Sequence, residues 1–276
     1  MEHGERKQKT LASFGSSCID YYVNLNGGTA FAGGGPVNSA VIAASLGIRA
    51  KYVGAVGSDA YGAYLLRCMR EKGVDTSRVH VVDGESALCE VTLADHERIL
   101  GDYREGVLAD FKLNEEDMRQ IAEADICLCD LWGNQAEFFP KLKEAGACIA
   151  FDCADTPDDS RAQAVIPYCD LLFFSAEEDT PALREKMRSL QDQGPRIVVA
   201  TLGSRGSLAL QEDFVCCEAC QPDAVIDSMG AGDTYIAGFL AGILNGMTLA
   251  EAMKQGSRLA AAALSYYGAF PQEGLR

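Results

Sequence analysis

Short apolar segments alternate with helical segments along most of the chain, and this alternation limits the possible folds more than any other feature. Strands are predicted at residues 11–15, 52–56, 126–130, 148–152, 171–175 and 197–202. Helices are predicted at residues 36–46, 61–72, 114–124, 138–145, 181–193, 234–245 and 249–266. Such a succession is typical of an α/β fold, in which helices cover both faces of a mostly parallel sheet.

Two stretches break this succession. Residues 80–82, 87–93 and 98–103 are β-prone and follow one another without an intervening helix, and residues 21–31 have the same character. These stretches predict a small antiparallel sheet added to the main domain. At the carboxyl edge of the parallel sheet, it would form a lid over a ligand crevice.

We expect a single domain, since no repeat, low-complexity segment or second linker is evident in the sequence. The domain should span residues 10–270, with lid segments at about 18–32 and 85–106. Residues 1–9 are polar and charged and should form a flexible N-terminal extension.

The chain is acidic, with a net charge of −16 from 24 basic and 40 acidic side chains. This balance disfavours nonspecific binding to nucleic acid or to anionic membranes. No apolar run approaches the roughly 20 residues of a membrane span, and the chain does not start with a signal-peptide core. The 11 cysteines are scattered through apolar segments, which favours reduced thiols in a cytoplasmic protein.

A glycine turn, Asp-Ser-Met-Gly-Ala-Gly-Asp-Thr at residues 227–234, precedes the small, apolar helix that follows. A helix N-terminus without bulky side chains exposes backbone N–H groups to an anion. Asp233 inside such a site is predicted to be a general base that takes a proton from a hydroxyl. The backbone amides would hold the charge of a transferring phosphoryl group. A tight turn with Asp233 as a helix cap remains the alternative.

Two more glycine-rich segments adjoin predicted elements. Gly-Gly-Gly-Pro-Val-Asn at residues 33–38 leads into the first helix, where a ligand could approach the backbone closely. Asn38 would offer a donor and acceptors to hydroxyl groups. Thr-Leu-Gly-Ser-Arg-Gly at residues 201–206 follows a strand, and would hold nucleotide phosphates or form a plain β-turn.

Taken together, these motifs occur in a distinctive order: Asp20, residues 33–38, residues 56–59 with Gly62, residues 201–206 and residues 227–233. In this order they resemble the PfkB, or ribokinase-like, family of carbohydrate kinases, over about residues 10–270. The resemblance implies a ribokinase-like three-layer α/β/α fold with a β lid. It also implies Mg²⁺-dependent phosphoryl transfer from ATP to a primary sugar hydroxyl.

The resemblance also implies roles for individual residues. The catalytic base would be Asp233, and the anion hole would be formed by the amides of Gly230, Ala231 and Gly232. The sugar-binding positions would be Asp20, Gly34, Gly35 and Asn38. The nucleotide-loop positions would be Thr201, Gly203 and Gly206. A monovalent cation such as K⁺ would be held by Asp227 and by the carbonyls of Met229, Ala263 and Gly268.

Two departures from the family pattern concern the metal. The family commonly has Asn-x-x-Glu before the nucleotide loop, and here Ser175 replaces the asparagine while Glu178 keeps the acidic position. We expect Ser175 and Glu178 beside ATP, with Glu178 acting on Mg²⁺ indirectly. The alternative is that Glu178 lies in a solvated helix start. The family's Asp-x-Asn-x-Arg stretch is Asp-Cys-Ala-Asp-Thr at residues 152–156.

Within the family, residues 15–20, 101–111, 131–133 and 226–240 resemble the branch that phosphorylates the 6-hydroxyl of fructoselysine, an Amadori product. Tyr103 lies in an acidic and aromatic segment that suits a cationic ligand. Trp132 would stack on the sugar or the amine, and Arg104 would meet a substrate carboxylate or point to solvent. The alternatives are that Trp132 fills core space and that Tyr103 packs the lid.

Other functions remain open at this point. The acceptor could be another sugar (fructose, ribose or 2-keto-3-deoxygluconate) or a nucleoside. A catalytically silent sugar- or nucleotide-binding protein is a further alternative, which the intact Asp233 disfavours. Because lid sheets in this family often pair across a dimer, we expect a homodimer.

Overall fold

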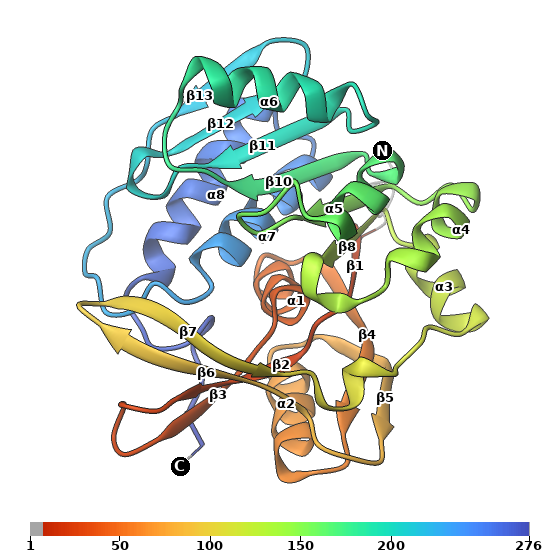
Figure 1. The fold of residues 1–276 in the computed structure, drawn as a ribbon, viewed down its shortest axis with the longest axis vertical. Helices are drawn as coiled ribbons and strands as arrows, with labels where there is room; N and C mark the ends of the chain where they lie inside the picture. Colours follow the sequence, from red (N-terminus) through yellow and green to blue (C-terminus); the bar gives the residue numbers. More distant parts are fainter. Residues whose placement is uncertain (1–7, 276) are drawn as a thin grey trace, which may run out of the picture.

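The computed structural model describes residues 8–275, which form two sheets and eight α-helices (Figure 1). The main sheet has the order β13-β12-β11-β10-β9-β8-β1-β4-β5, and the lid sheet has the order β3-β2-β6-β7. The main strands are β1 (Thr10–Phe14), β4 (Arg49–Gly57), β5 (Asp75–Val82), β8 (Ile126–Asp130), β9 (Ile149–Asp152), β10 (Leu171–Ser175), β11 (Ile197–Thr201), β12 (Ser207–Leu210) and β13 (Phe214–Cys217). The lid strands are β2 (Cys18–Tyr22), β3 (Thr29–Gly33), β6 (Ala87–Ala94) and β7 (Glu97–Arg104).

Helices cover both faces of the main sheet, which confirms the predicted three-layer fold. One face carries α1 (Gly35–Ser45), α2 (Ala60–Glu71), α7 (Ala231–Leu244) and α8 (Leu249–Ala263). The other carries α3 (Glu115–Ala122), α4 (Phe139–Glu144), α5 (Ser160–Val165) and α6 (Pro181–Gln191). Strand β10 shows why two layers are needed: Leu171 and Phe173 enter one core, whereas Leu172 enters the other. Alternate side chains of a strand point to opposite faces, so an all-apolar strand must be covered twice.

The lid grows out of the main sheet at its carboxyl edge. Strand β1 leads directly into β2, and the four lid strands project as a curved ribbon beside α1 (Figure 1). Asp59 ties the lid base to α2, because its carboxylate accepts hydrogen bonds from Gly62 N at the helix start and from Ser86 ahead of β6. The lid is therefore anchored to the frame that carries the strand ends.

Three details differ from the sequence-based expectations. Residues 80–82 belong to β5, which pairs in parallel with β4 rather than with the lid, because α2 makes a β-α-β crossover between the two strands. The lid is mixed, since β2 and β6 run parallel while its other pairs are antiparallel. The hairpin of β12 and β13 adds an antiparallel edge after β11, and its four-residue strands are too short to show a period in the sequence.

The predicted N-terminal extension falls mostly outside the described residues. Of residues 1–9, only Gln8 and Lys9 are described, and both contact the domain. The Gln8 side chain donates to the carbonyl of Gly47, and Lys9 pairs with Asp125 at 3.0 Å. Among residues 8–275, no helix is long and apolar enough to cross a membrane.

Candidate active site

The N-terminus of α7 presents backbone amides that the protein itself leaves free. Gly230 precedes the helix with φ 71°, and within residues 8–275 no side chain caps it. The amides of Gly232 and Asp233 have no acceptor in the same range, and Ala231 N reaches Ser228 O only at 3.4 Å. Gly230 is needed there because a Cβ atom would lie 2.4 Å from the Cβ of Ala269. Free amides at a helix start form an anion-binding site.

Asp233 lies in the first turn of α7, half-buried, beside α1. Its Oδ2 accepts a hydrogen bond of 2.8 Å from the side-chain amide of Asn38. Burial raises the pKa of Asp233 above its usual value, although the bond from Asn38 and the charge of Arg98 act in the opposite direction. A carboxylate with a raised pKa is a stronger base than an exposed aspartate. The neighbouring Gly35 makes room, since a Cβ atom there would lie 3.1 Å from Oδ1 of Asp233.

Two buried oxygens beside this carboxylate lack hydrogen-bond donors. They are Oδ1 of Asn38 and Oδ2 of Asp20, for which no partner is found among residues 8–275. Asp20 comes from β2 of the lid and is 5% exposed. Burial, together with the charge of Asp233, raises the pKa of Asp20 to about 7 against the opposing effect of a hydrogen bond from Cys18. An unpaired buried acceptor costs free energy, so hydroxyl donors of a polyol would bind favourably here.

The structure adds two carboxyl groups to which sequence reasoning assigned no role, Asp130 and Asp152. They end the neighbouring strands β8 and β9. Burial raises the pKa of Asp130 to about 6, even though its carboxyl accepts hydrogen bonds from Ser16. Burial and then the charge of Asp233 raise the pKa of Asp152 to about 8. A useful signal was present, since both are the last residues of predicted strands that end at the same sheet edge.

The predicted acceptor-side residues Tyr103, Arg104 and Trp132 lie around the lid and the end of β8. On β7, Tyr103 faces Cys89, which in turn faces Asp20, so all three share the lid face toward Asp233. Burial raises the pKa of the Tyr103 phenol. Trp132 follows β8 and is 47% exposed, so it is not a core residue. Arg104 is also exposed.

The predicted ATP-side residues lie at the ends of β10 and β11. Ser175 and Thr201 are cross-strand neighbours whose hydroxyls are 3.1 Å apart. Gly203 begins the turn after β11 and Gly206 ends it. Glu178 is exposed in the loop after β10. The structure thus brings Ser175 and Thr201 together and leaves the Glu178 carboxylate open to solvent.

The residues predicted to hold a monovalent cation include the buried Asp227, and the other three lie around its carboxylate. Its Oδ1 accepts a bond of 3.0 Å from Met229 N, and its Oδ2 accepts bonds from Tyr22 and from Gly268 N at 2.9 Å. Ala263 ends α8, one residue before the carbonyl of Leu264 that accepts from Asp227 N at 3.3 Å. All four predicted positions therefore lie close together.

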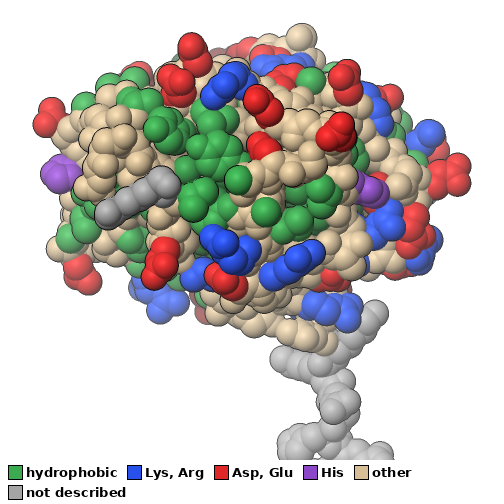
Figure 2. Space-filling view, turned by 90° about the horizontal axis from the view of Figure 1, so that it is seen from below, with side chains coloured by type: hydrophobic (Ala, Val, Ile, Leu, Met, Phe, Trp, Pro, Cys, Tyr) green, Lys and Arg blue, Asp and Glu red, His purple; other side chains and the backbone are tan. Residues whose placement is uncertain are grey.

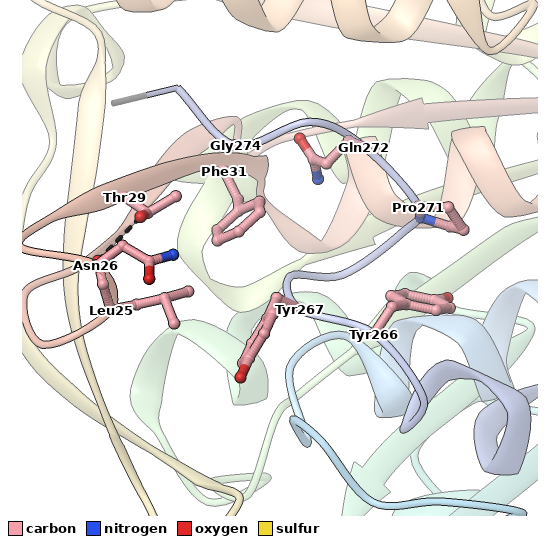
Figure 3. A pocket seen from close by; sticks show the side chains of 9 residues that line it. All are labelled: Leu25, Asn26, Thr29, Phe31, Tyr266, Tyr267, Pro271, Gln272 and Gly274. Atoms are coloured by element: carbon pink, nitrogen blue, oxygen red, sulfur yellow. Dashed lines mark hydrogen bonds between the residues drawn. The ribbon is translucent and has the colours of Figure 1, made fainter.

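A pocket of about 360 Å³ lies elsewhere, between the β2–β3 turn and the C-terminal segment (Figure 3). Its lining residues are Leu25, Asn26, Thr29, Phe31, Tyr266, Tyr267, Pro271, Gln272 and Gly274. None of the residues predicted to bind sugar or ATP lines it, so it is separate from the site around Asp233.

Comparison with known proteins gives consistent results. The model for "pfkB family carbohydrate kinase" matches residues 8–273. Fructoselysine 6-kinase of Shigella flexneri is 44% identical over 262 residues, which cover 95% of this chain and 100% of that protein. The fructosamine kinase FrlD of Bacillus subtilis (strain 168) is 28% identical, covering 94% and 92%. Ribokinase of Arabidopsis thaliana, solved with ribose and ATP, superposes with a TM-score of 0.83 at 20% identity, covering 95% of each chain.

Proposed function

The chain belongs to the pfkB family of carbohydrate kinases, and we propose that its acceptor is the 6-hydroxyl of fructoselysine or of a related fructosamine. The family match makes it an ATP-dependent carbohydrate kinase. The observation that carries the proposal is the pair of donor-less oxygens of Asp20 and Asn38 beside the Asp233 carboxylate. The acceptor is inferred from the similarity to fructoselysine 6-kinase.

The proposed mechanism uses Asp233 as the base. The acceptor hydroxyl lies between Asp233 and the free amides of α7, with its neighbouring hydroxyls on Asp20 and Asn38. Asp233 takes the hydroxyl proton while the oxygen forms a bond to the γ-phosphorus of ATP. The bond from that phosphorus to the bridging oxygen breaks, and ADP leaves with the electron pair. The amides of residues 230–232 stabilise the charge on the transferring group.

The proposed ATP site is the carboxyl edge of β10 and β11. The Ser175 and Thr201 hydroxyls and the turn from Gly203 to Gly206 offer donors to phosphate. The exposed carboxylate of Glu178 lies beside these strand ends. A site that offers a carboxylate open to water suits a hard cation that keeps most of its water ligands. Mg²⁺ bound there with ATP would neutralise charge on the β- and γ-phosphates, and Glu178 would hold it through water.

We also propose a monovalent cation such as K⁺ near Asp227. This carboxylate is buried and, within residues 8–275, has no cationic partner. Its hydrogen bonds come from neutral groups, two of them the backbone amides of Met229 and Gly268. Buried charges are normally compensated. A cation held by nearby carbonyls, including that of Ala263, would supply this compensation.

The amino-acid tail of the substrate would lie along Tyr103 and Trp132. Trp132 carries the Arg161 guanidinium 5.2 Å above its ring, and Asp159 holds that guanidinium in place. A fixed, stacked guanidinium can receive a substrate carboxylate. Arg104 on the exposed lid edge is a second candidate for the same group. The acidic residues near Tyr103 would face the amine.

Two properties of the whole protein follow as proposals. We propose a homodimer formed through the lid, because Ile99 and Leu100 on β7 are more than half exposed. Figure 2 shows the molecule from below the view of Figure 1, and hydrophobic side chains gather in the middle of the face seen there. We also propose a cytoplasmic location, because all 11 cysteines are free thiols and seven of them are buried.

A screen of acceptors tests the substrate proposal. ADP formation would be measured with fructoselysine, other fructosamines, fructose, ribose, 2-keto-3-deoxygluconate and adenosine. We expect the highest kcat/KM with a fructosamine. Trp132→Ala should raise KM for fructoselysine and leave KM for plain fructose unchanged, because fructose has no amino-acid tail. A preference for fructose or ribose over every fructosamine would reject the proposed acceptor while leaving the kinase activity intact.

A further inference from the structure

The tip of the β6–β7 hairpin contacts the turn that precedes α7. The backbone N of Arg98 donates to the hydroxyl of Ser228 at 3.3 Å, and that hydroxyl donates to Glu97 at 2.9 Å. The guanidinium of Arg98 donates through Nη1 to the carbonyl of Ser228 at 3.1 Å. Ser228 lies two residues before Gly230, so the lid is docked directly onto the start of the anion-binding turn.

Arg98 belongs to the lid face that looks toward Asp233. It is paired with Leu93 across the hairpin, in register with the row of alternate β6 residues that includes Cys89, the partner of Asp20. Its charge reaches the site, because it acts to lower the pKa of both Asp20 and Asp233 against the larger effect of burial. Within residues 8–275, no acceptor is found for its Nη2 group.

The carboxyl groups around the reaction centre indicate a role for the positive charge of this arginine. Asp20 approaches from β2, Asp130 from β8, Asp152 from β9 and Asp233 from α7. Other titratable groups near Asp20 are the thiols of Cys18 and Cys89, the phenol of Tyr103 and the carboxyl group of Asp227. Burial raises the pKa of both thiols and of the phenol. An incoming phosphoryl group would bring further negative charge close to these carboxyl groups. A guanidinium pre-positioned by two bonds to Ser228 matches the geometry of phosphate oxygens.

We propose that Arg98 binds the phosphoryl group during transfer, and that Ser228 is the docking point that holds this arginine over Asp233 when the lid is closed. During transfer the acceptor oxygen bonds to phosphorus, its proton moves to Asp233 and the bond to ADP breaks. Arg98 neither gains nor loses a proton. Its free N–H groups donate hydrogen bonds to the phosphoryl oxygens as negative charge develops on them. This role rests on the family's reaction and is independent of which sugar is the acceptor.

The test compares Arg98→Gln and Arg98→Lys, assayed with whichever acceptor the unmodified protein phosphorylates fastest. Arg98→Gln should lower kcat by about 10²–10³-fold, as expected for losing one donor to a developing charge, with little change in KM for the acceptor. Arg98→Lys should recover part of the rate, because a point charge remains. The acid limb of kcat/KM should move to higher pH in Arg98→Gln, since the charge that lowers the pKa of Asp233 is gone.

Two controls separate this role from simple lid stability. Arg49→Gln removes the same charge at the start of β4, the opposite edge of the sheet, and should leave kcat unchanged. Glu97→Gln disturbs the docking to Ser228 but keeps the guanidinium, so it should cost less than Arg98→Gln. If Arg98→Gln unfolds, Arg98→Lys is compared with the unmodified protein for calorimetric binding of Mg·ADP-aluminium fluoride with the acceptor. Wild-type kcat in Arg98→Gln, equal losses in Arg98→Gln and Glu97→Gln, or unchanged aluminium fluoride affinity in Arg98→Lys would overturn the proposal.

Discussion

Asp233 shows how a single residue acquires its chemistry from its neighbours. An aspartate in the first turn of an ordinary exposed helix would be a weak base that stabilises the helix dipole. Here burial raises its pKa, Asn38 orients it, and the free amides of α7 would hold an anion beside it. The same side chain is thereby a stronger base than an exposed aspartate.

Replacing this carboxylate gives the first residue-scale prediction. Asp233→Asn should lower kcat by roughly 10²–10⁴-fold, the usual contribution of general acid–base catalysis. KM for ATP should change little, because ATP is expected at the ends of β10 and β11. Steady-state kinetics measures both quantities. Asp213→Asn, the same substitution in the exposed β12–β13 turn, is the control. Near-normal turnover in Asp233→Asn would contradict the role of base.

At the scale of elements, the two faces of the lid sheet differ in their surroundings. Its inner face supplies Asp20 and Tyr103 to the site, whereas Ile99, exposed by 55%, neighbours Thr92 on the opposite face. Strand β7 is one of the two edge strands of this sheet, and among residues 8–275 it pairs only with β6. An exposed edge strand with apolar side chains invites pairing with another chain. The lid is thus suited both to cover the substrate and to hold a second copy.

A substitution on this edge tests the proposed dimer. Ile99→Lys should shift the protein from dimer to monomer, because a charged side chain would have to be buried in the interface. Val81→Lys is the matched control, since Val81 is equally exposed on β5 and is not part of the lid. Sedimentation velocity over a range of concentrations measures the outcome. A dimer that survives Ile99→Lys, or a wild-type protein that is monomeric throughout, would argue against pairing through the lid.

At the scale of the whole molecule, the buried carboxyl groups of the site lower the free energy of unfolding when they are ionised. The pKa values of Asp20, Asp130 and Asp152 rise on folding to about 7, 6 and 8. The folded protein therefore binds more protons than the unfolded chain between the ordinary aspartate pKa and these values. Linkage then requires stability to fall as pH rises through this range. Mg²⁺ and substrates, which compensate the charges, should restore part of it.

Asp152→Asn tests this relation without removing a hydrogen bond, because an asparagine oxygen can still accept from Ala154 N. At about pH 3.5 the variant and the wild type should unfold at nearly the same temperature, since Asp152 is then largely protonated in both the folded and the unfolded chain. Above pH 8 the variant should be more stable, because the wild type must hold a buried charge there. Thermal unfolding followed by circular dichroism measures the difference. Identical pH profiles, after comparison with Asp213→Asn, would show that Asp152 is not buried in this way.

Much of the architecture was predictable because its causes are local. The strand–helix succession, the start of α1 (predicted at Pro36 and found at Gly35) and the glycine turn before α7 all depend on residues a few positions apart. The strand at residues 80–82 was placed in the wrong sheet, because the pattern of a strand does not name its partner. The β12–β13 hairpin was missed for a related reason, since strands of four residues carry little periodic signal.

The sequence alone therefore determined the layers of the fold and the turns that expose free amides, because side-chain period and glycine content act within a few residues. Only the tertiary structure decided which charged groups share the reaction centre. Arg98, Asp130 and Asp152 are far apart in the chain, and they meet Asp233 because parallel strands end at one edge and a hairpin folds back over it. The raised pKa values of the three aspartates come from burial and mutual distance, two quantities that no local pattern contains.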